Sequence, residues 1–370
     1  MATPKKVMKY STSSELANLW LEDLPDELII KVFSFLETRD LICLGQLSIR
    51  IRAITHDEQF WQKINLSYID MRKIPARFLK MAIENGCKYL SLYPNLVGGT
   101  FGLDQASPLT YLKLQFHKKE FKQLKQFSFT EELLLSCHSL QKLSMNIDIT
   151  FDWITLICNQ NGKTLQVLDL NGCKIAGKRE FKLQPVQVIV RNCTNLKEVN
   201  FDSTNLSEEA VPYLVENITP SIEVLSLNYC FWVNDEHIKI LVNRCRKLKT
   251  LNLATTRITT KSLTDIIETL KPSLEKLDVY NRHIDPMNLL ELRAMPKLQI
   301  LIVWSSLHVK EQLQNYLPNL VIYDLGYKDP KPFCKDHQQF IDNFPSAGNL
   351  PDKDGIWEIK VKPLKLFRSS

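Results

Sequence analysis

Leu165-Gln-Val-Leu168-Asp-Leu170 is a phrase that this chain repeats several times through its middle. The same apolar pattern, L-x-x-L-x-L, begins again at Leu196, Ile222, Leu248 and Leu274, and these four copies start 26 residues apart. A fixed period of this size, headed by this phrase, is the signature of a solenoid of leucine-rich repeats. The sequence therefore predicts a stack of repeats, in which each repeat buries its apolar face against its neighbours.

Each repeat combines two elements of different period. In the L-x-L part, apolar and polar side chains alternate, as they do in a strand with one buried face. Between phrases the apolar residues follow helical spacing, as at Leu263, Ile266, Ile267 and Leu270. We therefore expect an α/β solenoid of about ten repeats over residues 68–325, with parallel strands on the concave face and helices on the convex face.

The polar residues of the strands are the candidate binding surface, because they should point away from the buried leucines. This predicted concave wall consists of Asp169, Asn171, Asn200, Asp202, Ser226, Asn228, Asn252, Ala254, Asp278 and Tyr280. Its candidate substrate-binding residues, together with aromatic anchors nearby, are Asn228, Asn252, Asp278, Tyr280, Arg282, Trp304 and Trp357. Arginine pairs bidentately with phosphate, so Arg257, Arg282 and Arg293, with His283, could meet a phosphate, but for any single arginine a solvated surface charge is the favoured interpretation.

The amino-acid composition limits the classes of function that this chain can have. The 370 residues are 44% hydrophobic and 24% charged, as in ordinary soluble proteins. The net charge of +6 is mild and spread along the chain, which argues poorly for nucleic acid. The nine cysteines form no C-x-x-C pair, and four of them end a helix just before the next strand: Cys87, Cys137, Cys193 and Cys245. We interpret these four as buried thiols of a protein in a reducing compartment.

Neither a signal peptide nor a membrane helix is predicted, so we expect a soluble protein of the nucleus or cytoplasm. Residues 1–18 read as a flexible polar arm. Residues 326–370 leave the repeat pattern and are rich in proline, but residues 356–361 alternate apolar and charged side chains like a strand. Because an exposed strand of this kind invites aggregation, we expect this tail to fold back onto the repeats.

Residues 19–67 lack the repeat phrase and predict a separate module of three short helices. Pro25 lies where a first helical turn tolerates proline. We expect Asp40 to cap the second helix, and Thr55 with Glu58 to form the capping box of the third. The expected apolar residues of the three helices are Leu28, Val32, Phe33 and Leu36; Leu41, Leu44 and Leu47; and Phe60, Trp61 and Ile64. So short a segment forms a marginal core and needs a partner or a neighbouring domain.

Four pieces of this module, in order, resemble an F-box: Leu24-Pro25-Asp26-Glu27-Leu28, Val32-Phe33-Ser34-Phe35-Leu36, Asp40-Leu41 and Asp57-Glu58-x-x-Trp61. The resemblance implies docking on a Skp-type adaptor, which in turn binds a cullin scaffold. The adaptor-binding residues that it implies are Leu24, Pro25, Glu27, Leu28, Leu36, Leu41 and Trp61. One departure is Leu47-Ser48-x-x-Ile51, where many F-boxes carry Val-Cys-x-x-Trp or Phe. The alternative interpretation is a polar N-terminal cap for the solenoid.

An F-box followed by repeats, with Tyr229-Cys230-Phe231-Trp232 in the middle and Ile356-Trp357-x-Ile359 in the tail, resembles the S-phase-kinase-associated group of F-box/leucine-rich-repeat proteins. These are substrate receptors of cullin-RING ubiquitin ligases. The resemblance implies a tail along the concave face and a small cyclin-kinase regulatory subunit that helps to present a phosphorylated target. The segment around residues 334–344 departs from that pattern.

Catalysis is not predicted. The seven histidines are scattered without metal-ligand spacing, and no glycine-rich phosphate loop occurs, so we expect no cofactor and no metal. The sequence therefore predicts a non-catalytic substrate-recognition subunit of an SCF-type ubiquitin ligase. The alternative is an interaction scaffold whose F-box no longer recruits a cullin, and an RNA-binding solenoid is a more distant one.

Overall fold

A computed structural model describes residues 21–36, 38–66, 76–93, 102, 106–115, 127–175, 180–304 and 307–324. Three predictions lie outside these residues: the arm over residues 1–18, the tail over residues 326–370, and the substrate-binding role of Trp357.

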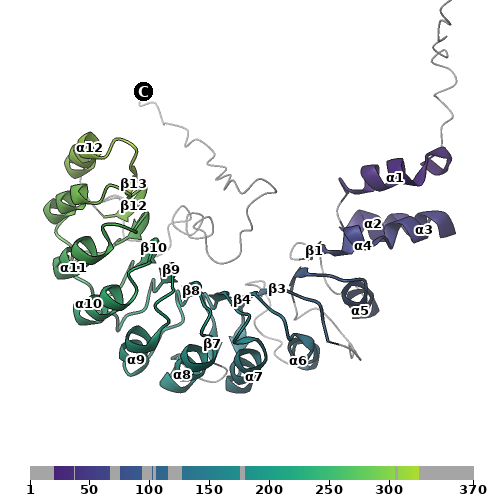
Figure 1. Cartoon of the computed structure of the whole chain (residues 1–370), viewed down its shortest axis with the longest axis horizontal. Helices are drawn as coiled ribbons and strands as arrows, with labels where there is room; N and C mark the ends of the chain where they lie inside the picture. Colours follow the sequence, from purple (N-terminus) through teal and green to yellow (C-terminus); the bar gives the residue numbers. More distant parts are fainter. Residues whose placement is uncertain are drawn as a thin grey trace, which may run out of the picture.

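The described residues form an arc, with strands along its inner edge and helices along its outer edge (Figure 1). Eleven strands make one parallel sheet: β1 (Lys63–Asn65), β2 (Tyr89–Leu92), β3 (Tyr111–Gln115), β4 (Lys142–Asn146), β6 (Val167–Asp169), β8 (Glu198–Asn200), β9 (Val224–Ser226), β10 (Thr250–Asn252), β11 (Lys276–Asp278), β12 (Ile300–Val303) and β13 (Val321–Asp324). The predicted α/β solenoid is confirmed, and β1 adds a strand that the sequence pattern did not predict.

Helices cover the convex side, one for each repeat. They are α5 (Ala76–Glu84), α6 (Phe127–Ser136), α7 (Phe151–Asn161), α8 (Leu183–Asn192), α9 (Ala210–Asn217), α10 (Asp235–Arg244), α11 (Thr260–Leu270), the 3-10 helix η5 (Pro286–Ala294) and α12 (Leu307–Tyr316). Two short strands, β5 (Asp148–Ile149) and β7 (Lys174–Ile175), form a second ladder. Pro212 fits because α9 begins at Ala210, which places the proline in the first turn, where no hydrogen bond is lost.

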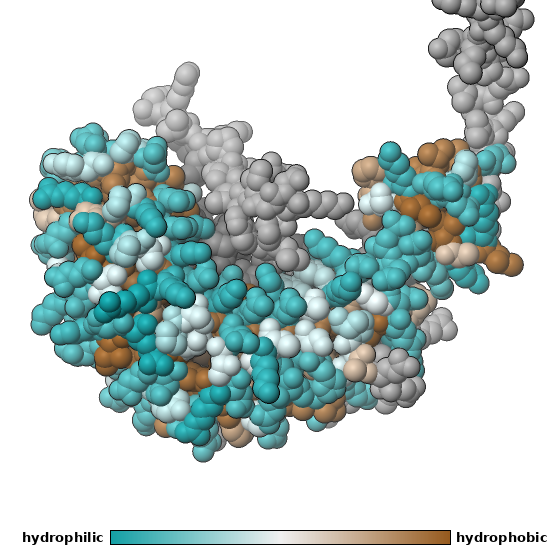
Figure 2. Space-filling model, in the orientation of Figure 1, coloured by the Kyte–Doolittle hydropathy of each residue, from teal (hydrophilic) through white to brown (hydrophobic). Residues whose placement is uncertain are grey.

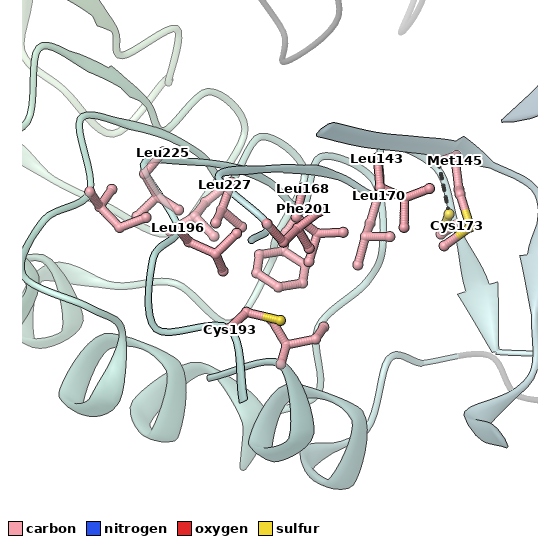
Figure 3. Packing of buried hydrophobic residues seen from close by; sticks show 14 of the residues in the cluster. Leu143, Met145, Leu168, Leu170, Cys173, Cys193, Leu196, Phe201, Leu225 and Leu227 are labelled. Atoms are coloured by element: carbon pink, nitrogen blue, oxygen red, sulfur yellow. Dashed lines mark hydrogen bonds between the residues drawn. The ribbon is translucent and has the colours of Figure 1, made fainter. Parts of the chain in front are cut away.

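The core is a row of leucines that continues from repeat to repeat. In each strand the central apolar residue pairs with its equivalent in the next strand, as Leu225 does with Leu251 and Leu251 with Leu277. The residues two positions further along the chain form a second buried row. Figure 3 shows Leu170, Phe201 and Leu227 of this row packed above the helices. Full burial of each such side chain is worth about 1.5–3 kcal/mol, so the stack is held by many equal contributions.

The turns after the strands repeat as well. Gly172, Ser203, Tyr229 and Thr255 follow consecutive strands at the same position, with φ angles of 72, 57, 58 and 55°. The N–H of each donates to a carbonyl of the next repeat, at 2.7 to 3.1 Å. A left-handed conformation is costly for residues other than glycine, and these inter-repeat hydrogen bonds hold it in place.

The four helix-end cysteines are buried, as predicted. Cys193 and Cys245 are the C-caps of α8 and α10. Burial raises the pKa of the Cys87 and Cys137 thiols to about 12 and that of Cys245 to about 11, so these side chains remain protonated thiols at neutral pH.

The N-terminal module contains η2 (Leu21–Asp23), α1 (Asp26–Phe33), α2 (Thr38–Leu44), α3 (Ile49–Thr55) and α4 (Glu58–Trp61). Three local predictions are wrong. Asp40 lies inside α2 rather than at its cap, because the helix already begins at Thr38. Thr55 ends α3, and α4 is capped instead by Asp57, whose side chain accepts from the N–H of Gln59. Ile64 belongs to β1, so the solenoid begins inside the predicted module.

Candidate functional site

Helix α1 has one buried and one exposed apolar face. Ile29 and Phe33 are buried, whereas Leu28 is 49% and Val32 48% exposed. Phe35, just beyond the helix, is 82% exposed. Leu28 and Val32 are spaced i, i+4, so they lie on one side of α1, and Phe35 follows shortly after the end of that helix. The predicted single stripe of Leu28, Val32, Phe33 and Leu36 is therefore wrong: it joined residues of both faces.

Arg50 joins the start of α3 to the start of α1, and further exposed apolar residues lie next to it in the chain. The guanidinium of Arg50 donates to Asp26 Oδ1 at 2.6 Å and to the carbonyl of Leu24 at 2.7 Å. Beside Arg50 at the start of α3, Ile49 is 86% exposed, and Leu47 is 67% exposed. We call Leu28, Val32, Phe35, Leu47 and Ile49 the exposed module face.

Hydrophobic residues gather on this module in the space-filling view (Figure 2). Single exposed apolar residues are common on any protein, but a group of them on so small a module marks an interaction surface. The core of the module contains the buried neighbours of these residues, among them Phe33 and Phe60, whose ring centroids lie 6.4 Å apart. The module therefore presents an apolar surface for which the described residues provide no cover.

The predicted adaptor-binding residues divide between this surface and the core. Pro25, Glu27 and Leu28 are exposed, and Leu24 and Leu36 are half-buried. Leu41 and Trp61 are only 4% and 2% exposed. The Trp61 indole N–H donates to the carbonyl of Thr55 at 2.9 Å, and this bond joins α4 to the end of α3.

The predicted direct contact of Leu41 and Trp61 with an adaptor is therefore wrong, because their side chains fill the interior of the module. Sequence reasoning missed Val32, Phe35, Leu47 and Ile49 as surface residues. The helical spacing from Leu28 carried the signal for the first two, but a stripe by itself does not reveal which side of a helix the tertiary structure leaves open.

The predicted concave wall is aligned as expected but largely buried. Asp169, Asn200, Ser226, Asn252 and Asp278 form one row, each paired in register with the next. Of the ten predicted wall residues, eight are buried, and only Asn171 and Tyr280 are half-buried.

Hydrogen bonds to the backbone satisfy these polar side chains in their buried positions. The side-chain oxygens of Asp169, Asn200, Asn252 and Asp278 each accept from the N–H two residues further on, at 2.8 to 3.1 Å. Such local bonds order the turn that follows each strand. The Asp202 carboxylate accepts from the Ser226 hydroxyl at 2.6 Å in the neighbouring repeat.

The predicted contact of Asn228, Asn252 and Asp278 with a substrate is therefore wrong, because these residues are only 1–2% exposed. Burial away from water raises the pKa of Asp278 to about 7, and that of Asp202 likewise to about 7. Both carboxyls consequently carry only partial charge near neutral pH.

The other predicted substrate-binding residues lie at the ends of the strands. Tyr280 and Trp304 are half-buried and stack, with ring centroids 5.9 Å apart and planes at 23°. The guanidinium of Arg282 lies 5.9 Å from the Trp304 ring. The sequence pattern did not predict the neighbouring contact, in which the Arg257 guanidinium lies 3.7 Å from the ring centroid of Phe231 and 4.7 Å from that of Trp232.

Within the described ranges, no group of three or more histidine, cysteine, aspartate or glutamate side chains could hold a metal ion. The part of the chain that the structure describes also contains no helix long and apolar enough to cross a membrane.

Comparisons with known proteins concern the module and the repeats separately. The F-box-like family matches residues 21–67. The ubiquitin ligase complex F-box protein UFO1 of Saccharomyces cerevisiae is 38% identical over 62 residues, which cover 17% of this chain and 9% of that relative. The matched segment thus spans less than a tenth of the relative, and its likeness is confined to that segment.

Among solved structures, the Rad7–Elc1 complex of yeast is 16% identical with a TM-score of 0.41, and the alignment covers 84% of this chain and 94% of that one. The C-terminal domain of tropomodulin from Caenorhabditis elegans is 18% identical with a TM-score of 0.31 and covers 36% of this chain and 89% of that one. The helical module, its apolar exposed face and the family match agree, and residues 21–67 are an F-box-like domain at the head of a solenoid of the leucine-rich-repeat type.

Proposed function

We propose that this chain is the substrate-recognition subunit of a ubiquitin ligase of the Skp adaptor–cullin–F-box type. The observation that carries the proposal is the exposed module face. Leu28, Val32 and Phe35 are exposed apolar residues of an F-box-like domain, whereas their neighbours Ile29 and Phe33 are buried in its core. A marginal module keeps such side chains in water at a cost, and binding of a Skp-type adaptor would remove that cost.

The repeats then hold the target protein. Strand β1 of the F-box-like segment pairs with β2, so the domain and the solenoid share one sheet. Because the sheet is continuous, it would hold the adaptor and the target in a fixed relative position. The subunit contributes orientation and local concentration, while the adaptor-bound cullin and its partners supply the chemistry. We infer a non-catalytic subunit that needs no cofactor and acts in the nucleus or the cytoplasm.

Target recognition is proposed for the residues at the strand ends that remain accessible: Tyr280, Arg282 and Trp304. The half-buried pair of Tyr280 and Trp304 offers the rigid aromatic surface that protein interfaces favour. A role for Trp357, and the use of a small cyclin-kinase regulatory subunit, stay predictions from the resemblance to the S-phase-kinase-associated group.

Co-expression of the full chain with a Skp-type adaptor and a cullin tests the proposal. We expect both proteins to co-purify with it in equal amounts. Capture of the adaptor without the cullin would favour the alternative function, an interaction scaffold. Capture of neither would overturn the ligase assignment. Replacement of Leu24 and Pro25 by alanine should abolish adaptor capture yet leave thermal melting of the repeats nearly unchanged.

A further inference from the structure

The first four strands of the sheet carry lysines but no carboxylate on the face that points away from the core. These strands lie at the inner edge of the arc, beside the N-terminal module (Figure 1). Successive side chains of a strand point to opposite faces, and the leucines of β2, β3 and β4 pack in the core. The residues of the other face are Lys63, Asn65, Tyr89, Ser91, Tyr111, Lys113, Gln115, Lys142, Ser144 and Asn146.

The register of the sheet brings the lysines and tyrosines of this face together. Lys63 on β1 pairs with Tyr89 on β2, and Tyr89 pairs with Tyr111 on β3. Tyr111 pairs in turn with Lys142 on β4. Neighbouring strands lie about 4.8 Å apart, so the backbones of Lys63 and Lys142 are about 14 Å apart and those of Lys113 and Lys142 about 8 Å. We call these five residues the lysine–tyrosine face.

The two tyrosines form a rigid centre for this face. Their rings stack, with centroids 4.3 Å apart and planes at 12°. Tyr111 is only 3% exposed, whereas Tyr89 is half-buried and keeps part of its ring accessible. The Lys63 ammonium lies 5.4 Å from the centroid of the Tyr89 ring, within the range of a cation–π contact. The tyrosine stack thus provides an aromatic surface between lysines.

The three lysines have no counter-charge on their own face. Lys63 is exposed, and Lys113 and Lys142 are half-buried. None of them forms an ion pair with a residue that the structure describes. Like charges at such separations repel one another, and an anionic partner would replace this repulsion by attraction.

The carboxyls of the following strands do not supply that counter-charge. Asp169 on β6 accepts from the Ser144 hydroxyl at 2.8 Å and from the N–H of Asn171 at 3.1 Å. Burial raises the pKa of Asp169 and of Glu198 on β8, which disfavours the charged form of both carboxyls. The lysines therefore remain available to a carboxylate from outside the chain.

The sign of the charge changes along the sheet, and this limits the kind of anion that fits. The next four strands carry two carboxyls and no cation on the same face: Val167, Asp169, Glu198, Asn200, Val224, Ser226, Thr250 and Asn252. An RNA backbone that extended along the sheet would meet these carboxyls. A short acidic stretch of protein would end before them, because about 14 Å corresponds to four or five extended residues. Lysine is a point charge with rotatable donors, so it pairs with carboxylates in varied geometries.

We propose that the lysine–tyrosine face binds an extended acidic segment of a partner protein. Carboxylates of that segment would pair with Lys63, Lys113 and Lys142, and its methylene groups would pack on the Tyr89 ring. This surface lies apart from the exposed module face and from the strand ends proposed for target recognition, and it requires no adaptor.

Fluorescence anisotropy with the full chain tests this surface. The probes are three labelled peptides of equal length, in which serine alternates with glutamate, glutamine or lysine, and a mixed-sequence RNA of similar length. We expect the glutamate peptide to bind about ten-fold more tightly than the glutamine peptide, since each exposed ion pair adds a modest factor. Added salt should reduce this preference, because it screens exposed charges. Equal binding of the glutamate and glutamine peptides, or tighter binding of the RNA, would overturn the proposal.

Variants locate the surface. Lys63→Gln, Lys113→Gln and Lys142→Gln combined should remove the preference for the glutamate peptide. The matched control combines Lys239→Gln, Lys261→Gln and Lys271→Gln, which remove the same charge from exposed positions of α10 and α11 and at the end of α11. The control should bind within about two-fold of the wild type, since its lysines are separate from the lysine–tyrosine face. Unchanged binding by the first variant, or an equal loss in the control, would refute the surface.

Charge reversal gives a second test that loss of folding cannot imitate. Lys113→Glu combined with Lys142→Glu should make the chain prefer the lysine peptide over the glutamate peptide. All variants should melt close to the wild-type temperature, because the ammonium groups that they replace form no ion pair in the described part of the chain. A reversed variant that melts normally and shows no reversed preference would contradict the proposal.

Adaptor capture separates this proposal from the ligase assignment. The triple glutamine variant of the lysine–tyrosine face should capture a Skp-type adaptor at the wild-type level, because none of its lysines belongs to the exposed module face. Loss of capture would show that these lysines serve the adaptor, and would overturn the proposal. Binding of the glutamate peptide by a wild-type chain that captures no adaptor would support the surface and refute the ligase assignment.

Discussion

Replacement of Phe35 by alanine is the sharpest test of the exposed module face. A phenylalanine carries roughly 150–250 Å² of surface, so a side chain that is 82% exposed offers about 160 Å² to a partner. At about 25 cal/mol per Å², complete burial of this area is worth about 4 kcal/mol. We therefore expect Phe35→Ala to weaken binding to a Skp-type adaptor by 2–4 kcal/mol, a factor of about 30 to 1000.

The assay is a titration of purified adaptor onto the full chain by calorimetry, together with thermal melting of each variant. Phe35→Ala should leave the melting temperature within a degree or two, since the exposed ring supports no core. Phe33→Ala, two residues earlier and only 1% exposed, should instead cost about 3–5 kcal/mol of stability. Phe231→Ala is the matched surface control, because it removes a 51% exposed ring that follows β9, far along the chain from the F-box-like domain. Adaptor affinity of Phe35→Ala within two-fold of wild type would refute the role of this face.

Three further predictions concern the solenoid. Asn161 is fully buried, and its side chain accepts from the N–H of Leu140 at 2.8 Å and donates to the carbonyl of Cys137 at 2.9 Å. Asn161→Ala leaves both groups unpaired and should lower the free energy of unfolding by about 2–5 kcal/mol in urea titrations, whereas the exposed Asn243→Ala should lower it by less than about 0.5 kcal/mol. Gly162 ends α7, and a Cβ there would overlap the backbone oxygens of Asn192 and Cys158, so Gly162→Ala should cost about 2 kcal/mol or more, and wild-type stability would contradict the packing of α7 on α8. Asp278 has its pKa raised from 3.8 to about 7 by burial. The folded chain therefore holds a proton that the unfolded chain releases, so this contribution is complete below about pH 4 and is lost as the pH rises to about 7. Asp278→Asn keeps the oxygen that accepts from Tyr280 and should gain about 2–3 kcal/mol over the wild type between pH 5 and pH 8, and a gain that does not grow with pH would show that the carboxyl is not desolvated.

Local sequence determined the repeating unit of this protein. The phrase that begins at Leu248 places Leu251 and Leu253 on the buried side of a strand, and the helical spacing from Leu263 to Leu270 places a helix behind it. Both patterns follow from the fixed geometry of strand and helix, which acts over a few residues. The F-box motif was likewise readable, because its pieces occur in order within one short segment.

Tertiary structure decided which polar and apolar side chains remain accessible. Alternation predicted that Asn252 and Asp278 would be available to a partner, but in the structure both are buried and their side-chain oxygens accept from the backbone of the turns that follow. Spacing likewise could not tell Leu28 from Ile29, since helix α1 is apolar on two sides and only its packing against the rest of the module chooses the buried one. The arginine stacks required contacts between neighbouring repeats, and a residue such as Arg257 meets Phe231 only because the solenoid brings successive turns side by side.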